Sequence, residues 1–564
     1  MKLIASILSF KQKKIIYKNI NFKKYKNIYK LLKNKILNSR NILTMMSISI
    51  LFIFNAKSDN KEDTPPNIVF IMADDHAVSA ISAYNDWLAE SAPTPNIDRI
   101  AKGGMLMNRT FNTNSICGPS RAAILTGKYA HINGFYKNEG GGDFDGSQQT
   151  FPKILQNNGY QTAVIGKWHL GTTPTGFDYS KVMINHGGQG TYYNTLFLEN
   201  GKDTIRENKR HSTEQVAYDA LNWLDKKRDK NKPFMLMYQF KAPHRPWTPN
   251  SKFDSLFSNE DLPYPDTFND DYEGRLAASE NMLEIENHMN RKDLKLIPPT
   301  GLSKKETGRW NRLGNNGEFW TPNDTLQGMD LKKWKYQRYI KDYLRCVAGV
   351  DESVGKMLDY LKENNLDENT IVIYTSDQGF YLGEHGWFDK RWMYEPSFRM
   401  PFMIKYPKKI KPKSINDELI VNVDFAPTIL DLAGIKPPKD MQGESFKKQL
   451  FDEKHSKRDA VYYHYYEYPF WHKVQPHYGV RTSRYKLIHY YYNMNEWELF
   501  DLDNDKDELN NLYEKDGYSN ITKDLKEKIK KLQSKYKDDM SLEEMRKMTD
   551  TRIKRVYTEM NSKN

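Results

Sequence analysis

The chain has 564 residues and a formal net charge of +13, and that charge is concentrated at its beginning. Residues 1–58 hold 13 of the 85 Lys and Arg residues and no acidic residue, whereas from Asp59 onward 72 basic residues face 72 acidic ones, which argues against a cationic body that grips nucleic acid. Two cysteines, Cys117 and Cys346, are too few for a disulfide framework or a multi-cysteine zinc site.

The basic leader ends in the apolar run Ile42–Phe54, which is 13 residues long. This is shorter than the roughly 20 residues of a membrane-spanning helix. Basic residues before the run and small or polar residues after it are typical of a secretory signal. We therefore expect export to the periplasm or the cell surface of a bacterium. An uncleaved leader would instead be an anchor, and the membrane would then be contacted only through it.

Four later apolar runs have the length of β-strands and are separated by helix-like stretches. Near-continuous apolar runs are typical of parallel strands that are buried on both faces. Two of the helix-like stretches, Glu214–Lys227 and Tyr343–Leu361, place apolar residues on one face. The pattern predicts an α/β fold, in which helices cover both faces of a large, mostly parallel sheet. The predicted strands are Asn67–Ala73, Gln161–Gly166, Phe234–Phe240 and Thr370–Thr375.

The composition changes after the last of these runs. Residues 461–492 contain ten Tyr and four His, which predicts the antiparallel strands of a smaller sheet. A helix is predicted from about Asn520, and residues 250–340 have the irregular composition of an insertion over the site. We therefore predict a leader at 1–64, a catalytic domain at 65–455, and a C-terminal α+β subdomain at 456–564.

Ionisable residues follow each of the four predicted strands. The carboxyl ends of parallel strands meet at one edge of a sheet, where open α/β sheets bind their ligands. Polar residues follow most strands because loops are polar. Here, however, two of the clusters contain Asp and the other two contain Lys and His. We expect them to converge on one site. The clusters are Asp74-Asp75-His76, Lys167-Trp168-His169, Lys241-Ala242-Pro243-His244-Arg245 and Ser376-Asp377-Gln378-Gly379.

The segment Cys117–Gly127 reads Cys-Gly-Pro-Ser-Arg-Ala-Ala-Ile-Leu-Thr-Gly. Pro119 suits the first turn of a helix, so Cys117 is predicted to lie at a helix N-terminus, which favours an anion. Arg121, about one turn later, could donate two hydrogen bonds from its guanidinium group to the same anion. From these residues alone, Cys117 could also be a thiolate nucleophile of lowered pKa, or a buried structural cysteine.

The pattern Cys-x-Pro-Ser-Arg-x-x-x-Leu-Thr-Gly resembles the modification motif of the type I sulfatases, which share the alkaline phosphatase fold. The resemblance extends from Pro65 to the C-terminal sheet. It implies that Cys117 is oxidised by a formylglycine-generating enzyme to formylglycine (3-oxoalanine), whose hydrated aldehyde is the nucleophile. It also implies one Ca²⁺ site formed by Asp74, Asp75, Cys117, Asp377 and Gln378. Gln378 departs from the more frequent Asn but keeps the amide oxygen, which leaves Mg²⁺ open.

The same resemblance gives roles to the cations and histidines around the anion. Arg121, Lys167 and Lys390 would clamp the sulfate oxygens. His169 would take a proton from the second hydroxyl of the nucleophile, so that sulfate is released. His244 would protonate the oxygen of the leaving alcohol, because an alkoxide is a poor leaving group.

The residues after Gly379 (Gly379–Arg391, Gly-Phe-Tyr-Leu-Gly-Glu-His-Gly-Trp-Phe-Asp-Lys-Arg) look like the bacterial branch similar to N-acetylglucosamine-6-sulfatases. This predicts an exo-acting hydrolase of sulfate esters on a sulfated oligosaccharide or polysaccharide, either a host glycan or an algal one such as ulvan. The high aromatic content favours a sugar ligand. The candidate substrate contacts are Trp247, His385, Arg391, His472 and His477.

Two alternatives remain open from the sequence. The same superfamily fold supports phosphate- and phosphonate-ester hydrolases, some of which share the formylglycine. A catalytically silent sugar-binding protein is the more distant alternative. The retained Cys117 and the complete set of acidic ligands argue against a silent protein, and the Lys/His set around the anion favours sulfate.

Overall fold

The computed structural model describes residues 64–138, 143–296, 303–305, 307, 326–455, 457–469 and 472–561. The described residues after Thr64 all belong to the second of two units of the chain, Pro65–Asn564. The predicted leader, with its apolar run, lies outside the described residues. The predicted boundary near residue 456 falls within the second unit and stays a prediction.

A ten-stranded sheet runs through the second unit, and its centre consists of four parallel strands. Strand β1 (Asn67–Ala73) lies between β9 (Thr370–Ser376) and β8 (Phe234–Gln239), and β8 also pairs with β4 (Gln161–Gly166). All seven residues of β1 are buried, as expected for a strand covered on both faces. These are the four predicted strands, with ends that differ by one residue at most.

The outer strands make the sheet mixed. The strand order is β13-β2-β12-β9-β1-β8-β4-β5-β6-β7, and β12, β6 and β7 run antiparallel to their neighbours. The prediction of a mostly parallel sheet is confirmed, and its antiparallel edges were not anticipated. The outer strands are β2 (Met105–Met107), β5 (Tyr179–Met183), β6 (Thr195–Glu199), β7 (Asp203–Glu207), β12 (Phe402–Lys405) and β13 (Ser414–Asn416).

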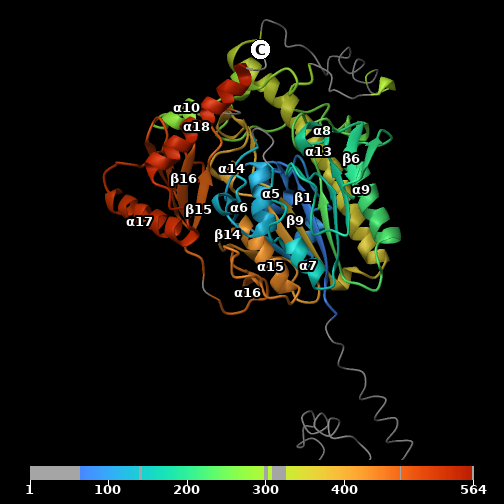
Figure 1. Cartoon of the computed structure of the whole chain (residues 1–564). Helices are drawn as coiled ribbons and strands as arrows, with labels where there is room; N and C mark the ends of the chain where they lie inside the picture. Colours follow the sequence, from blue (N-terminus) through green and yellow to red (C-terminus); the bar gives the residue numbers. More distant parts are fainter. Residues whose placement is uncertain are drawn as a thin grey trace, which may run out of the picture. The chain divides into compact units, whose positions relative to one another are not determined.

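Helices cover both faces, and alternate residues of β1 point into two separate cores. Val69 and Ile71 belong to the core beneath α9 (Ser212–Asn222) and α13 (Gly328–Glu363), whereas Phe70 belongs to the opposite core. This alternation follows from the two-residue period of a strand. In Figure 1 the second group of helices covers the face turned away from α9 and α13. That group comprises α5 (Cys117–Thr126), α7 (Phe151–Asn157) and α15 (Phe425–Leu432).

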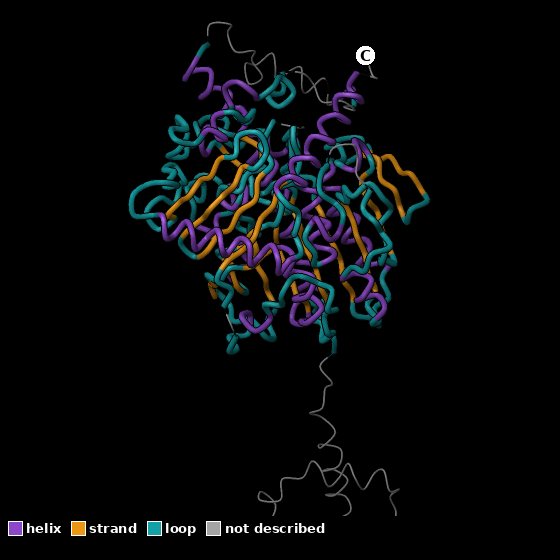
Figure 2. The backbone as a smooth tube through the Cα atoms, turned by 60° about the vertical axis from the view of Figure 1, so that its left-hand side comes forward, coloured by secondary structure: helices purple, strands orange, loops and turns teal. Residues whose placement is uncertain are grey.

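The C-terminal part forms a separate four-stranded antiparallel sheet, as predicted. Its strands follow chain order, and Figure 2 is turned to bring this side of the molecule forward. The predicted last helix is α17 (Ser519–Tyr536), and a further helix, α18 (Leu542–Asn561), was not predicted. The sheet consists of β15 (Ala460–Tyr465), β16 (His477–Thr482), β17 (Tyr485–Tyr490) and β18 (Glu496–Asp501).

Short elements complete the described chain. Two small strand pairs join β3 (Thr110–Phe111) to β14 (Ile420–Val421) and β10 (Tyr381–Leu382) to β11 (Phe388–Asp389). The short helices are α4 (Asp98–Lys102), α6 (Ala130–Asn133), α8 (Asn185–Gly188), α10 (Leu276–Ser279), α11 (Ile285–His288), α14 (Glu395–Phe398) and α16 (Lys447–Leu450).

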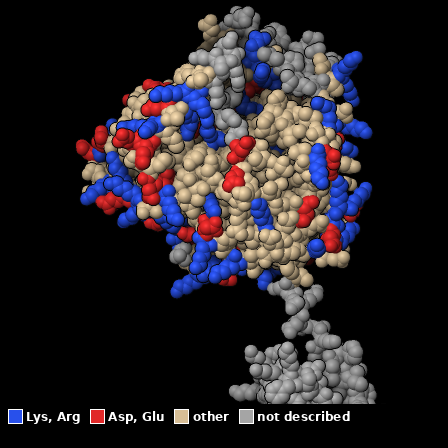
Figure 3. Space-filling model, in the orientation of Figure 1, with Lys and Arg blue, Asp and Glu red and all other residues tan. Residues whose placement is uncertain are grey.

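The surface of the described body mixes both signs of charge. Figure 3 shows Lys and Arg interspersed with Asp and Glu over the visible face, in keeping with the balanced composition after Asp59. In the part of the chain that the structure describes, no helix combines the length and the apolar character needed to cross a membrane.

Candidate active site

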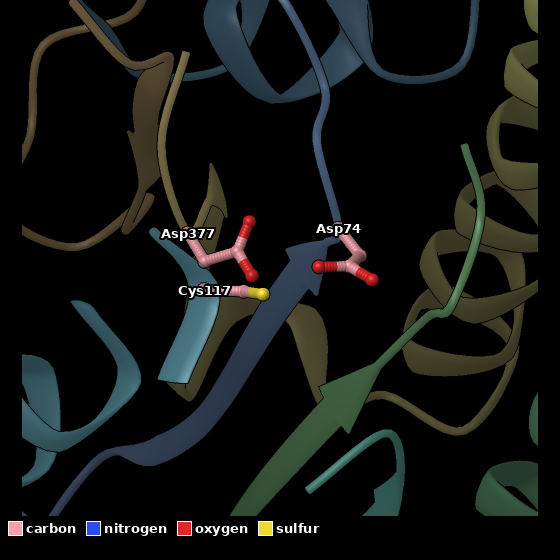
Figure 4. A group of neighbouring side chains, drawn as sticks. All are labelled: Asp74, Cys117 and Asp377. Atoms are coloured by element: carbon pink, nitrogen blue, oxygen red, sulfur yellow. The ribbon is translucent and has the colours of Figure 1, made fainter. Parts of the chain in front are cut away.

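Three of the predicted metal ligands meet where the central strands end. Asp74 follows β1 and Asp377 follows β9, and the two strands pair in parallel with Ala73 opposite Ser376. Cys117 is the first residue of α5, and ligand atoms of Asp74, Cys117 and Asp377 all lie within 4.8 Å of one another. Figure 4 shows the three side chains pointing toward one shared space. The sheet topology therefore assembles this part of the predicted site.

Each carboxylate at the site has its own cation. The ammonium of Lys167 contacts Asp74, and the ammonium of Lys390 lies 2.6 Å from both carboxylate oxygens of Asp75. Burial alone would raise the pKa of Asp74, but the positive charges of Lys167 and Arg121 hold the pKa of its carboxyl well below the usual range. All of these groups are buried, so their electrostatic interactions are little screened by water.

Asp75 has a left-handed backbone conformation, with φ = 65°. This region is uncommon for residues other than glycine, although aspartate tolerates it better than most. The conformation is held by the Asp75 amide, which donates to Asp377 Oδ1 at 3.1 Å, and by the Tyr343 hydroxyl of α13, which donates to the Asp75 carbonyl at 2.7 Å. The turn places the carboxylate of Asp75 against the ammonium of Lys390.

Cys117 lies at the start of α5, where the backbone changes from an extended Ile116 to a helix. The Asn138 amide donates to Cys117 Sγ at 3.1 Å, and its carbonyl oxygen accepts from the Gly118 amide at 3.1 Å. Although burial opposes it, the charges of Lys167 and Lys390 lower the pKa of the Cys117 thiol. The sequence did not single out Asn138, because it is in a loop without a recognisable pattern.

Arg121 is one turn into α5 and supports the other site residues. Its Nε donates to Asp377 Oδ2 at 3.0 Å, and its Nη1 donates to the Lys167 carbonyl and to Gln239 Oε1, both at 2.9 Å. Only Nη2, 3.5 Å from Asp74 Oδ1, lacks a hydrogen-bond partner among the described residues. The predicted contact of Arg121 with sulfate is thus limited to Nη2, and its other nitrogens hold Asp377, the Lys167 carbonyl and Gln239.

The two predicted catalytic histidines flank the carboxylates. His169 has a left-handed backbone (φ = 56°), and within the described chain its buried Nδ1 has no hydrogen-bond partner. His244 is buried, with its Nε2 3.7 Å from Asp75 Oδ2. Burial, followed by the charge of Lys167, lowers the pKa of both imidazoles well below the usual value, so both rings are neutral near pH 7.

The residues present fit a hard divalent cation. Asp74 Oδ1 and Gln378 Oε1 are buried without a hydrogen-bond partner among the described residues, which is costly unless something else coordinates them. Carboxylate and amide oxygens are the ligands that Ca²⁺ prefers, and Mg²⁺ accepts the same set in a stricter geometry. Asp75 and Gln378 contact each other, so the fourth and fifth predicted ligands lie in the same cluster.

Two of the predicted substrate contacts, Trp247 and His385, contact other side chains in the interior of the protein. Trp247 has no exposed surface and packs on Tyr339 and Phe380, at centroid distances of 4.6 and 6.3 Å. His385 is buried, and its Nδ1 lies 2.6 Å from Asp270 Oδ2. Trp247 is thus held by ring packing and His385 by a hydrogen bond with Asp270, and the binding of sugar by these two side chains stays a prediction.

His477 is also engaged inside the protein, and its contact with substrate stays a prediction. It is the first residue of β16, it has no exposed surface, and its ring stacks on that of Tyr463 at a centroid distance of 5.4 Å. Its Nδ1 lies 2.7 Å from the Gln475 carbonyl oxygen. A high aromatic content indicated a sugar ligand, but here the rings form the core of the C-terminal sheet.

Arg391 and His472 meet next to Lys390. The carboxylate of Asp389 contacts Arg391, lies 3.2 Å from His472 Nε2, and accepts from Arg245 Nη1 at 3.0 Å. Arg245 also pairs with Asp293 of the insertion at 2.6 Å. This cluster joins the loop of His244 to the loop of Lys390, and the sequence did not indicate its central residue, Asp389.

Known proteins match this chain over most of its length. The Sulfatase family model matches residues 66–435, and the model described as N-sulphoglucosamine sulphohydrolase, C-terminal, matches residues 383–535. An N-acetylglucosamine-6-O-sulfatase of Bacteroides thetaiotaomicron is 44% identical over 515 residues, which cover 88% of this chain and 91% of that protein. An ulvan-active sulfatase of Formosa agariphila is 25% identical over 489 residues, covering 83% of this chain and 81% of that protein.

Solved structures give the same result. The structure of BT4656 in complex with its substrate D-glucosamine-2-N,6-O-disulfate matches with a TM-score of 0.81 and 44% identity, covering 85% of this chain and 100% of that one. A phosphonate monoester hydrolase from Silicibacter pomeroyi has a TM-score of 0.62 at 18% identity, covering 84% of this chain and 96% of that one, which shows the fold alone. Sequence motif, site geometry and family match agree that the chain is a member of the sulfatase family and an enzyme that hydrolyses sulfate esters of sulfated carbohydrates.

Proposed function

We propose that this sulfatase removes the 6-O-sulfate from glucosamine-type sugars at the end of a sulfated glycan, with Cys117 converted to formylglycine and one Ca²⁺ bound. The single observation that carries the mechanism is the meeting of Asp74, Cys117 and Asp377 within 4.8 Å of one another, at the end of the parallel sheet. The choice of sugar is supported by the 44% identical relative named N-acetylglucosamine-6-O-sulfatase.

Two groups that the unmodified chain does not carry, a Ca²⁺ ion and formylglycine, would each supply part of the chemistry. A Ca²⁺ held by Asp74, Asp75, Asp377 and Gln378 would supply positive charge to the nucleophile and to a sulfate oxygen, and formylglycine at position 117 would supply the nucleophilic oxygen. The ammonium groups of this chain hold the anion in place. Their fixed position stabilises the charge that develops on the sulfate oxygens, without reorganisation during the reaction.

His169 and His244 divide the proton transfers. The neutral ring of His169 has an Nδ1 without a partner among the described residues, so this nitrogen is available to accept a proton. In His244 the Nδ1 lies 2.7 Å from the Arg245 carbonyl, which can only accept, so Nδ1 carries the proton. The free ring is neutral near pH 7, but the negative charge of a bound sulfate ester favours a second proton, which can reside only on Nε2, beside Asp75. From there it can be donated to the oxygen of the leaving alcohol.

A panel of defined sugars tests the proposed substrate. We expect faster desulfation of N-acetylglucosamine 6-sulfate and glucosamine 2-N,6-O-disulfate than of ulvan or carrageenan oligosaccharides, measured as released sulfate. Phosphate and phosphonate esters of matched alcohols belong in the same panel, since the fold alone is shared with a phosphonate monoester hydrolase. Faster turnover of the phosphorus esters would reject the proposed substrate class.

The metal assignment predicts that Asp377→Asn loses calcium and activity together. The substitution keeps the size of the side chain but removes the charge that the cation needs, so we expect less than one bound Ca²⁺ per chain by elemental analysis. The loss of turnover should exceed the roughly 10–100-fold that loss of a supporting residue costs. Added calcium should raise the melting temperature of the wild type and leave that of the variant unchanged.

Asp219→Asn is the matched control for the metal experiment. Asp219 is also a buried aspartate with a lysine partner, Lys181, at 2.9 Å, but it lies on α9 away from the site. It should keep its calcium. A variant Asp377→Asn that retains both calcium and turnover would contradict the metal site.

Arg391 is predicted to bind a sugar hydroxyl or carboxylate beside the sulfate. Removing a charge-assisted hydrogen bond costs about 1.5–3 kcal/mol, or roughly 10–100-fold in affinity. We therefore expect Arg391→Ala to raise KM for the sulfated sugar by that factor and to leave a small aryl sulfate almost unaffected. Arg484→Ala, which removes an exposed arginine paired with Asp501, is the control. An equal loss on both substrates would argue against sugar recognition by Arg391.

We further propose that the protein is exported to the periplasm or the cell surface by its basic leader, and that a formylglycine-generating enzyme acts on it during maturation. The cluster of basic residues before Ile42–Phe54 supports export. The Cys-x-Pro-Ser-Arg motif supports the maturation step. Fractionation of the native host, followed by N-terminal sequencing of the exported form, tests the first part. Recovery of the protein only from the cytoplasm would refute it.

A further inference from the structure

Lys241 is a fourth lysine or arginine at the sulfate-ester site, in addition to Arg121, Lys167 and Lys390. It comes two residues after β8, whose last residue, Gln239, pairs in register with Gly166 at the end of β4. The Lys167 amide donates to the Gln239 carbonyl at 3.0 Å, so the loops carrying the two lysines leave the sheet side by side. Lys241 is 3% exposed. It is therefore part of the buried lining at the edge of the sheet.

Lys241 differs from the other three cations because it has no carboxylate partner among the described residues. Arg121 pairs with Asp74 and Asp377, Lys167 pairs with Asp74, and Lys390 pairs with Asp75. Within the described parts of the chain, Lys241 forms no ion pair. Its ammonium contacts only the Arg245 carbonyl, at 3.4 Å, and the ring of Tyr192, with 5.3 Å to the centroid. An ammonium buried without a counter-ion is costly to maintain, which favours either its neutral form or the arrival of an anion.

The surroundings of Lys241 place its titration near neutrality. Burial lowers the pKa of its ammonium to about 7, and the charges of Lys167 and Lys390 add to this, while Asp74 and Asp75 oppose it. The ring of Tyr192 lies against the ammonium, and the Tyr192 hydroxyl donates to the His244 carbonyl at 2.6 Å. The titratable or charged groups that face Lys241 are Asp74, Asp75, Lys167, Lys390, Tyr192, His244 and, on α13, Cys346.

We propose that Lys241 is a further substrate-binding cation of this sulfatase, held without a counter-ion until the anionic sulfate ester enters the site. The proposal rests on the proposed function, since it takes the sulfate ester as the anion. It adds a residue that pairs with none of the acidic groups of the site and is therefore available to the substrate. Arg121, Lys167 and Lys390, by contrast, share their charge with the metal-binding carboxylates.

A binding cation of this kind links substrate affinity to pH. A bound anion raises the pKa of Lys241, so binding takes up a proton at pH values between the free and the bound pKa. Affinity should be constant below about pH 7 and fall by up to about tenfold per pH unit above it. His169 and His244 titrate well below this window. Burial also raises the pKa values of Asp75 and Asp377, so the contribution of Lys241 is the part of the pH dependence above 7 that is lost when Lys241 is replaced.

Calorimetric titration of the calcium-loaded enzyme with inorganic sulfate tests the proposal. Sulfate itself does not titrate in this range, and buffers of different ionisation enthalpy give the number of protons taken up. We expect the wild type to take up as much as about one proton per sulfate between pH 7.5 and 8.5. Lys241→Met should bind sulfate roughly tenfold more weakly or worse and take up none. Lys241→Arg should keep the affinity and also take up none, because an arginine stays charged.

Stability separates this role from a structural one. Removing an unpaired buried charge should leave the melting temperature of Lys241→Met unchanged or higher. The control Lys181→Met should lower the melting temperature, since Lys181 is a buried lysine paired with Glu207 and Asp219. The proton uptake of Lys181→Met on sulfate binding should equal that of the wild type.

Two results would overturn the proposal. One is equal sulfate affinity and equal proton uptake in the wild type and Lys241→Met. The other is a wild type that takes up no proton or fails to bind sulfate. Turnover of a sulfate ester by the wild type is measured in parallel. Absent turnover would contradict the proposed function, whereas normal turnover with unchanged proton uptake in Lys241→Met would contradict only the role of Lys241.

Discussion

Replacement of Cys117 by alanine should abolish hydrolysis of every sulfate ester, with kcat/KM reduced by at least about 10⁴-fold. The reason is chemical, because without the sulfur atom no aldehyde can be formed at this position and no nucleophile faces the sulfate. The buried cations remain, so the variant should still bind inorganic sulfate. Loss of turnover with retained sulfate binding, measured by kinetics and calorimetry on the same preparation, would separate a missing nucleophile from a collapsed site.

The chain contains its own control for this experiment. Cys346 is also a buried cysteine, but it lies on α13 within the apolar core, where burial raises the pKa of its thiol to about 12. Cys346→Ala should keep near-wild-type kcat/KM and lose at most some stability from the small cavity. Equal loss of activity in both cysteine variants, or persistent turnover by Cys117→Ala, would refute the assignment of the nucleophile.

The second large effect is expected from His244→Ala, and it should depend on the leaving group. General acid catalysis typically contributes 10²- to 10⁴-fold, and we expect a loss on the order of that range for sulfated sugars, whose leaving alkoxide is strongly basic. An activated aryl sulfate leaves as a phenolate that needs little protonation. Its turnover should therefore fall much less. A series of aryl sulfates of increasing phenol pKa, assayed with both proteins, measures this dependence.

The leaving-group series also identifies a false assignment. If His244 only positions the loop, the variant should lose a similar factor on every member of the series. Its hydrogen bonds make that a real alternative, because the His244 carbonyl accepts from Tyr192 at 2.6 Å and its amide donates to the Lys241 carbonyl at 3.0 Å. A steeper dependence on phenol pKa in the variant than in the wild type is the result that an acid role requires.

The fold could be predicted largely because its central strands are buried on both faces. Such strands are uninterrupted apolar runs, so β1 and β4 were predicted with their observed bounds. The edge strands gave no such signal. β7 (Asp203–Glu207) reads Asp-Thr-Ile-Arg-Glu, and in the described sheet it pairs with β6 alone. The sequence of such an edge strand does not show in which direction it will run. The last helix, α18, was missed because two of its buried residues, Thr549 and Arg552, are polar, so its buried face is not an apolar stripe.

The site could be predicted where a residue follows a strand or belongs to the Cys117 motif. Asp74, Lys167, His244 and Asp377 all do, and the parallel register brings them together. Residues that reach the site from loops, such as Asn138, had no such signal.

The substrate contacts were harder to predict because exposure depends on tertiary packing. Trp247 and His477 are suitable side chains for a sugar, and both are fully buried. For Lys241 the error was the opposite one: a residue that we propose to bind substrate was not among the predicted contacts. It stands in the same post-strand cluster as His244, and only the absence of a carboxylate partner within the described chain distinguishes it from a structural lysine.

Mass spectrometry of the peptide that contains Cys117, taken from protein purified from its native host, is the most direct test of the mechanism. We expect formylglycine at this position in the active enzyme, with Cys346 unmodified in the same sample. An unmodified Cys117 in protein that turns over sulfate esters at full rate would contradict the mechanism.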